Sequence, residues 1–212
     1  MRNITSNLYF ASFITLAVGI AIWYLQTEIK KENKQIILSI FTDILLQFAF
    51  SALGINALLN IQRVIQVPYS VLIFSSDIIF LAALVVVGYN SYKYGKKLFE
   101  NPKKARSVTE LLLLIGLMNH VYLYFLHSAK QSVIFITFYL VLLSLVTFTK
   151  ITQKIDPLIV LGLGSIAHII LMRGQPIIYF NFAFNPIPLA ILGIILIGTL
   201  FYYRRTLTSK VN

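Results

Sequence analysis

The chain has 212 residues, of which 58% are hydrophobic and only 12% charged, and its mean hydropathy is +0.82. A soluble domain usually carries about 25% charged residues, so this chain is too apolar to coat a surface that faces water. The absence of cysteine excludes disulfides, thiolate metal sites and cysteine nucleophiles.

Charge-free apolar runs predict an all-α, single-domain bundle of seven transmembrane helices, since about 20 apolar residues cross a bilayer core. The expected spans are 8–26, 36–59, 68–88, 108–127, 131–149, 157–172 and 186–203. The first run has no small-residue cleavage site behind it, which favours a retained helix over a signal peptide.

Local chemistry marks several positions along these spans. Pro68 is expected to open the third span. Ser107, with Glu110 three residues later, forms a capping-box pattern before the fourth span. Trp23 lies near the inner end of the first span, where an aromatic side chain is expected to anchor the helix at the membrane interface.

The basic residues predict the orientation of the chain. Of the 18 Lys and Arg residues, 14 fall in the first, third and fifth loops and the C-terminal tail, and the other four are Arg2, Arg63, Lys130 and Arg173. Cytoplasmic loops carry such an excess. We therefore expect a multi-pass cell-membrane protein with its N-terminus outside and its C-terminus in the cytosol. The same asymmetry accounts for the net charge of +11 without nucleic acid.

Two histidines inside spans are the first candidate site. His120 and His168 fall on the fourth and sixth spans at similar expected depths, toward the outside. They could be axial ligands of a b-type haem, ligands of a metal that still needs a third group, or parts of a proton relay with Asp77. They could equally hydrogen-bond neighbouring helices and hold the bundle together.

A polar stripe on the second span is the second candidate site. Ser39, Asp43, Gln47 and Ser51 recur every four residues and so share one helix face. Asp77 is expected near the middle of the third span. A carboxyl within the hydrocarbon must be protonated, bound to a cation or solvated by a water-filled path. A proton- or cation-coupled transporter would use Asp43, Gln47 and Asp77, and a protonated carboxyl in a local hydrogen bond is the alternative.

The stretch 177–185 is uncharged and aromatic, and it is too short to cross a membrane as a helix. It is expected to lie along the outer interface, to fold back over the bundle, or to dock a partner. Its candidate contact residues are Tyr179, Phe180, Phe182 and Phe184.

The sequence favours no enzyme. The seventh expected span has no lysine for a retinal Schiff base, and the chain contains neither an HExxH motif nor a glycine-rich phosphate loop. The leading expectation is a non-enzymatic membrane subunit of a larger respiratory or translocation assembly, with the lipid bilayer and other membrane subunits as partners. A small coupled transporter and a haem-carrying electron-transfer subunit are the alternatives.

Overall fold

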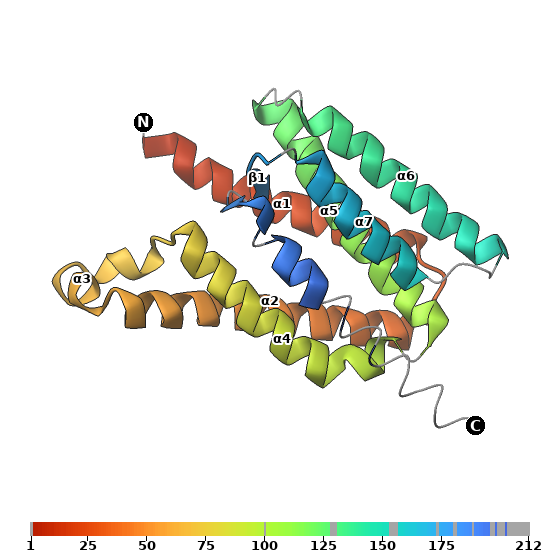
Figure 1. Ribbon diagram of the computed structural model, residues 1–212, viewed down its shortest axis with the longest axis horizontal. Helices are drawn as coiled ribbons and strands as arrows, with labels where there is room; N and C mark the ends of the chain where they lie inside the picture. Colours follow the sequence, from red (N-terminus) through yellow and green to blue (C-terminus); the bar gives the residue numbers. More distant parts are fainter. Residues whose placement is uncertain are drawn as a thin grey trace.

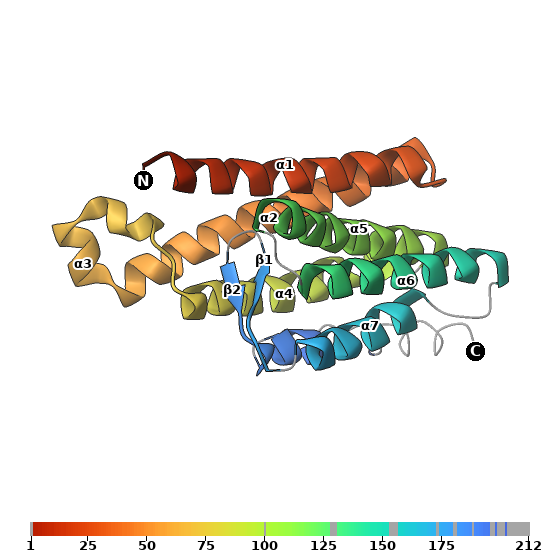
Figure 2. The ribbon, with the colours of Figure 1, turned by 90° about the horizontal axis from the view of Figure 1, so that it is seen from above.

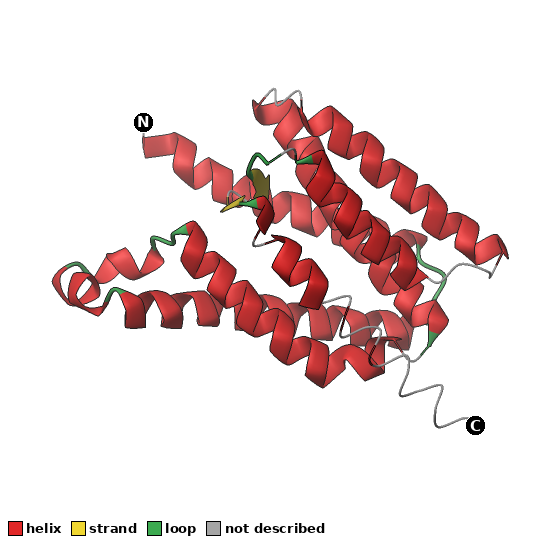
Figure 3. Cartoon of the chain, in the orientation of Figure 1, coloured by secondary structure: helices red, strands yellow, loops and turns green. Residues whose placement is uncertain are grey.

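The computed structural model describes the chain except for residues 1, 100, 128–130, 153–156, 173, 180–181, 188, 196–197, 199–201 and 203–212. Helices dominate the described residues, and two short strands form a hairpin (Figure 3). In chain order the elements are α1 (Arg2–Gln26), α2 (Lys31–Leu59), α3 (Ile61–Gln66), the 3-10 helix η1 (Pro68–Leu72), α4 (Ser76–Phe99), α5 (Pro102–His127), α6 (Gln131–Thr152), α7 (Pro157–Leu171), β1 (Ile177–Tyr179) and β2 (Phe182–Phe184).

Three helices of the described chain are long and apolar enough to cross a membrane: Lys31–Leu59, Ser76–Gly95 and Pro102–Phe125. Shorter apolar helices cover Phe13–Gln26, Gln131–Thr147 and Ile159–Leu171. The predicted helical class and the presence of helices able to span a membrane are therefore confirmed.

Helix α4, which corresponds to the predicted third span, differs from the prediction because it begins at Ser76 and runs to Phe99. Pro68 instead opens the short helix η1. Ser75 ends the intervening extended segment and caps α4, since its Oγ accepts the backbone N–H of Ile78 at 3.4 Å. The apolar run from residue 68 thus belongs to a connection, and Asp77 lies in the exposed first turn of α4 and not near its middle.

The predicted capping box at Ser107 is also wrong. Helix α5 already begins at Pro102, where Asn101 accepts the backbone N–H of Lys103 through its side-chain oxygen at 2.9 Å. Ser107 lies more than a turn inside the helix and is buried.

The helices form two groups that meet at one end. Helix α5 packs against α1, α6 and α7, while α2 and α4 run side by side as an antiparallel pair (Figure 1). The largest apolar cluster joins the groups near the α1–α2 and α4–α5 turns, where Trp23, Ile37, Leu98 and Leu111 are buried together. Toward the other end of α2 and α4, α3 and η1 form a projecting tip.

The β-hairpin lies across the α2–α4 pair (Figure 2). Its strands pair antiparallel, with Ile177 opposite Phe184 and Tyr179 opposite Phe182. Phe184 packs against Ala52 of α2 and Ile79 of α4. Of the three expectations for 177–185, the one in which the segment folds back over the bundle agrees with this arrangement.

Candidate functional site

The stripe predicted on α2 contacts α4 through two polar pairs, which we call the polar seam: Asp43 with Tyr94, and Gln47 with Asn90. The Tyr94 hydroxyl donates to Asp43 Oδ2 at 3.3 Å, and Asn90 Nδ2 donates to Gln47 Oε1 at 2.7 Å. Asn90 is buried and also donates to the Val86 carbonyl at 2.8 Å. Because the helices are antiparallel, a four-residue step on α2 is matched by a four-residue step backwards on α4.

The seam does not include the other predicted carboxylate. Asp77 precedes Tyr94 on the same helix by about 25 Å at the α-helical rise, and its side chain is exposed. Ser39, at the first position of the predicted stripe, is exposed as well. Asn90 and Tyr94 were not predicted, although their four-residue spacing mirrors that of Asp43 and Gln47.

The structure brings His120 and His168 together. Both rings are buried, and their centroids lie 6.3 Å apart. Phe135 of α6 contacts both histidines at 4.8 Å, with its ring stacked on His120 at an interplanar angle of 16°. Tyr139 lies 5.6 Å from His120 and 5.9 Å from His168. The sequence predicted the level depth of the histidines but not the aromatic rings around them.

The packing of this histidine cluster does not fit a haem. Phe135 is equidistant from the two imidazoles, so its ring centre lies in the plane that bisects the pair. A macrocycle with two axial histidines occupies that same plane between the rings. Among the described residues, no group of three or more His, Cys, Asp or Glu side chains could hold a metal ion. The cluster is an aromatic contact between α5, α6 and α7.

A buried hydrogen-bond network joins α1 to α5. The indole Nε1 of Trp23 donates to the carbonyl oxygen of Ser107 at 2.7 Å and to its hydroxyl at 3.0 Å. The Ser107 hydroxyl also shares a hydrogen bond of 2.8 Å with the Thr27 hydroxyl. Trp23 is 0% exposed, so it is a core residue and not the interfacial anchor that its position predicted.

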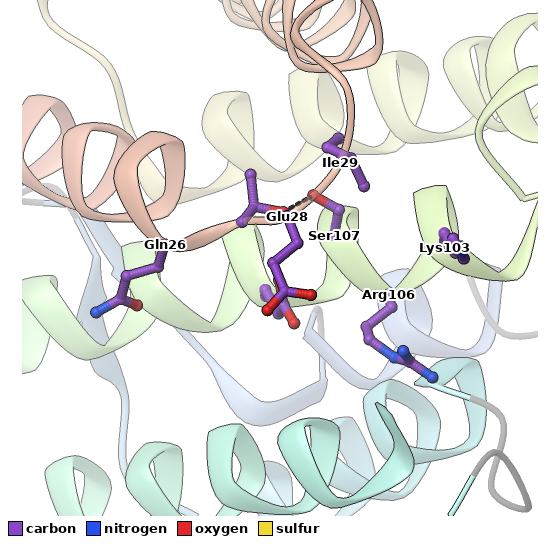
Figure 4. Close-up of a pocket in the computed structure, with 8 residues that line it drawn as sticks. Gln26, Glu28, Ile29, Lys103, Arg106 and Ser107 are labelled. Carbon is purple, nitrogen blue, oxygen red and sulfur yellow. Dashed lines mark hydrogen bonds between the residues drawn. The ribbon is translucent and has the colours of Figure 1, made fainter. Parts of the chain in front are cut away.

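A polar cleft of about 270 Å³ opens beside this network, where the α1–α2 turn meets the start of α5 (Figure 4). Glu28, Lys103 and Arg106 line it together with Glu110. A second hollow of about 210 Å³ shares Gln26, Thr27 and Glu110 with the cleft and also contacts apolar side chains of α5 and α6.

The charges of the cleft suit electrostatic contact better than covalent catalysis. Two carboxylates and two cations line it, so its formal charge is balanced. The one serine in its lining, Ser107, already bonds to Trp23 and Thr27. A nucleophilic serine needs a general base within hydrogen-bond reach, and no histidine lines this cleft among the described residues.

The aromatic residues predicted to contact a partner belong to the β-hairpin or lie outside the described residues. Phe184 packs on α2 and α4 of its own chain. Tyr179 and Phe182 pair across the hairpin, and Phe180 lies outside the described residues.

Comparisons with known proteins give no relative. The chain matches no protein family, no curated protein and no solved structure.

Proposed function

We propose that this chain is a multi-pass protein of the cell membrane with seven spans, its N-terminus outside and its C-terminus in the cytosol. The chain reverses direction at opposite ends of the molecule: the α1–α2 and α4–α5 turns lie at one end, and α3 lies at the other (Figure 1). The first end holds Lys30, Lys31 and Lys34 together with Lys103 and Lys104, as the cytosolic side should.

Within that topology, the proposed role is that of a membrane subunit in a larger assembly. The polar seam carries this proposal. A carboxylate and two amides lie between α2 and α4. Yet in an apolar 18-residue stretch of α2 only 17% of the residues are buried, against 67% in the corresponding stretch of α5. Polar groups at membrane depth face a bundle interior or a wet cavity. Two helices alone enclose neither, so a further protein helix is expected to cover the pair.

Photo-crosslinking tests this role. Leu46→Cys and Phe50→Cys place a benzophenone maleimide on the exposed face of α2, and Phe125→Cys places it on an exposed apolar residue of α5. In native membranes we expect one defined protein adduct from positions 46 and 50, and lipid adducts alone from position 125. Lipid adducts alone at all three positions would remove the subunit proposal.

A second candidate function, proton- or cation-coupled transport, is favoured by the bond between Asp43 and Tyr94. A carboxyl that exchanges a proton or cation needs a partner able to stabilise its charged form, and the tyrosine hydroxyl is such a donor. Infrared difference spectra of the protein in liposomes test this candidate through the carbonyl stretch of the Asp43 carboxyl.

The expected result is an infrared band that responds to pH or to Na⁺ and is absent in Asp43→Asn. Tyr94→Phe should change the frequency of that band, because it removes the hydroxyl that donates to the carboxyl. Asp77→Asn is the matched control, since Asp77 lies in an exposed first turn, and it should leave the band unchanged. A band insensitive to pH and Na⁺ would exclude this candidate.

A further inference from the structure

The connection between α2 and α4 exposes a run of large apolar side chains. We call residues 58–73 the apolar tip; they comprise the end of α2, helix α3, η1 and the first residue after it. Ile65 is 75% exposed and Leu72 is 63% exposed, and Leu58, Leu59 and Ile61 are exposed too. Arg63 is the one charged residue of the tip.

The backbone of the tip is hydrogen-bonded internally at successive turns. Val64 N–H donates to the Asn60 carbonyl at 2.9 Å, and Val67 N–H donates to Arg63 at 2.8 Å. In η1, the N–H groups of Ser70 and Ile73 donate to carbonyls three residues back, at 2.9 Å and 3.0 Å. The irregular connection thus retains turn-like bonds from α3 to its end.

Asn56 of α2 donates to carbonyl oxygens of η1 and of the residue after it, among them the Ser70 oxygen that also accepts the Ile73 N–H. Its Nδ2 lies 2.7 Å from the Val71 oxygen, 3.1 Å from that of Ile73 and 3.3 Å from that of Ser70. The Asn56 Oδ1 in turn accepts a hydrogen bond from Asn60 Nδ2 at 2.8 Å. Asn56 is buried, so this clamp fixes the tip from the inside.

A backbone bonded internally and large apolar side chains facing outward are the arrangement that lipid requires, and the exposed polar side chains of the tip, Gln62, Arg63 and Gln66, all lie on α3. Water would hydrate free carbonyls, whereas the hydrocarbon offers no partner to an unsatisfied backbone group. The apolar part of α2 from residue 36 to 59 measures about 36 Å at the helical rise, against a core of about 30 Å. This length brings the tip to the outer boundary of the hydrocarbon.

We propose that the apolar tip inserts into the outer interface of the lipid bilayer, with Tyr69 and Arg63 at the level of the headgroups. An aromatic ring with a polar end and a long cationic side chain both suit that depth. The inference rests on the proposed membrane topology and adds a lipid contact at the outer end of the α2–α4 pair, including residues 60–67, which lie between the second and third expected spans.

Fluorescence quenching in liposomes tests the insertion, because the chain has no cysteine and accepts single labels directly. Ile65→Cys and Leu72→Cys carry an environment-sensitive NBD dye. Phe50→Cys reports a site within α2, and Lys97→Cys reports an exposed site near the opposite end. Lipids with shallow nitroxides probe the interface, and iodide probes the water.

At positions 65 and 72 we expect quenching by shallow nitroxide lipid to exceed quenching by iodide several-fold, with the reverse order at position 97. Iodide quenching at 65 and 72 would overturn the insertion. Shielding from both quenchers would also overturn it, because a protein would then cover the tip. Quenching of position 50 by nitroxide lipid would support the membrane topology, whatever the result at positions 65 and 72. The absence of lipid quenching at position 50 would count against the topology itself.

Discussion

Where α1 crosses α5, the hydroxyl and the carbonyl of Ser107 bond to Trp23 of α1 and to Thr27 directly after it. Nearby, Gly19 lets the helices approach, since a Cβ added there would lie 3.3 Å from the Ile115 Cα. Small residues and interhelical hydrogen bonds are what membrane helices use to associate, because lipid provides no hydrophobic driving force between them. The contact therefore depends on a few specific atoms.

Ser107→Ala should destabilise the protein by about 1–3 kcal/mol, because the Thr27 hydroxyl would be buried without its partner. Trp23 keeps its bond to the Ser107 carbonyl, which limits the loss. Thermal unfolding in mild detergent measures the change. Ser144→Ala is the matched control: Ser144 is exposed and bonds the Leu140 carbonyl of its own helix, so its loss should be smaller. Equal effects would contradict the proposed importance of the network.

Gly116→Ala should destabilise the protein by about 1–3 kcal/mol through overpacking. The new Cβ would lie 2.6 Å from the Tyr139 ring, which itself packs beside both histidines. Gly88→Ala is the control, because nothing lies within 4 Å of its added Cβ and alanine favours a helix by about 1 kcal/mol. Opposite signs for the two substitutions in the same unfolding assay are expected.

What the sequence predicted at single residues depends on how local the pattern was. Asp43 and Gln47 share a face by spacing on one helix, and the structure places both against α4. The expectation for Trp23 failed because burial depends on which helix lies opposite. The predicted capping box at Ser107 failed for the same reason. The partners of Ser107 are 80 and 84 positions away, and spacing along α5 carries no information about them.

At the scale of elements, the start of α4 shows what hydropathy leaves out. The run from Pro68 to Phe74 is as apolar as a span, so it extends the predicted third helix toward the N-terminus. The structure uses it for η1 and an extended segment, and the helix begins after the Ser75 cap. The sequence analysis took Pro68 as the start of the helix, and the Ser75 cap emerged only from the structure, where Asn56 holds the connection between them.

Asn56→Ala should loosen the apolar tip more than the rest of the protein. The Val71 and Ile73 carbonyls would lose the Asn56 donor, at a cost of about 1–3 kcal/mol, while the Ser70 carbonyl keeps the Ile73 N–H. Hydrogen exchange of peptides covering 60–75, measured in liposomes, should rise several-fold while exchange in α5 stays unchanged. Asn60→Ala, which removes only the bond to Asn56 Oδ1, should have a smaller effect. Unchanged exchange in Asn56→Ala would show that the tip does not need the clamp.

At the scale of the whole molecule, the basic residues predicted which turns gather at one end, and Figure 1 shows the α1–α2 and α4–α5 turns there together. Charge counts could not predict which helices pair. The separation of α2 and α4 from the group around α5 follows from side-chain complementarity, as at Gly19 and in the polar seam. Spacing along the chain shows which residues share a helix face, but not which helix lies opposite that face.

Impermeant maleimide labelling of intact cells checks the proposed orientation. Gln175→Cys, on the exposed connection between α7 and β1, should be labelled from outside. Lys97→Cys, at the basic end of α4, should react only after the membrane is permeabilised. The opposite result would invert the topology. External labelling of both sites would mean that an even number of spans separates them, in place of the three that are expected.

The burial of Trp23 has a practical consequence, because it is the sole tryptophan of the chain. An indole that is shielded from solvent emits at shorter wavelength than one in water and is protected from acrylamide. The unmodified protein therefore contains an intrinsic optical reporter at the α1–α5 crossing. A red shift on heating or on adding denaturing detergent should report the moment at which α1 separates from α5, and Ser107→Ala should bring it forward.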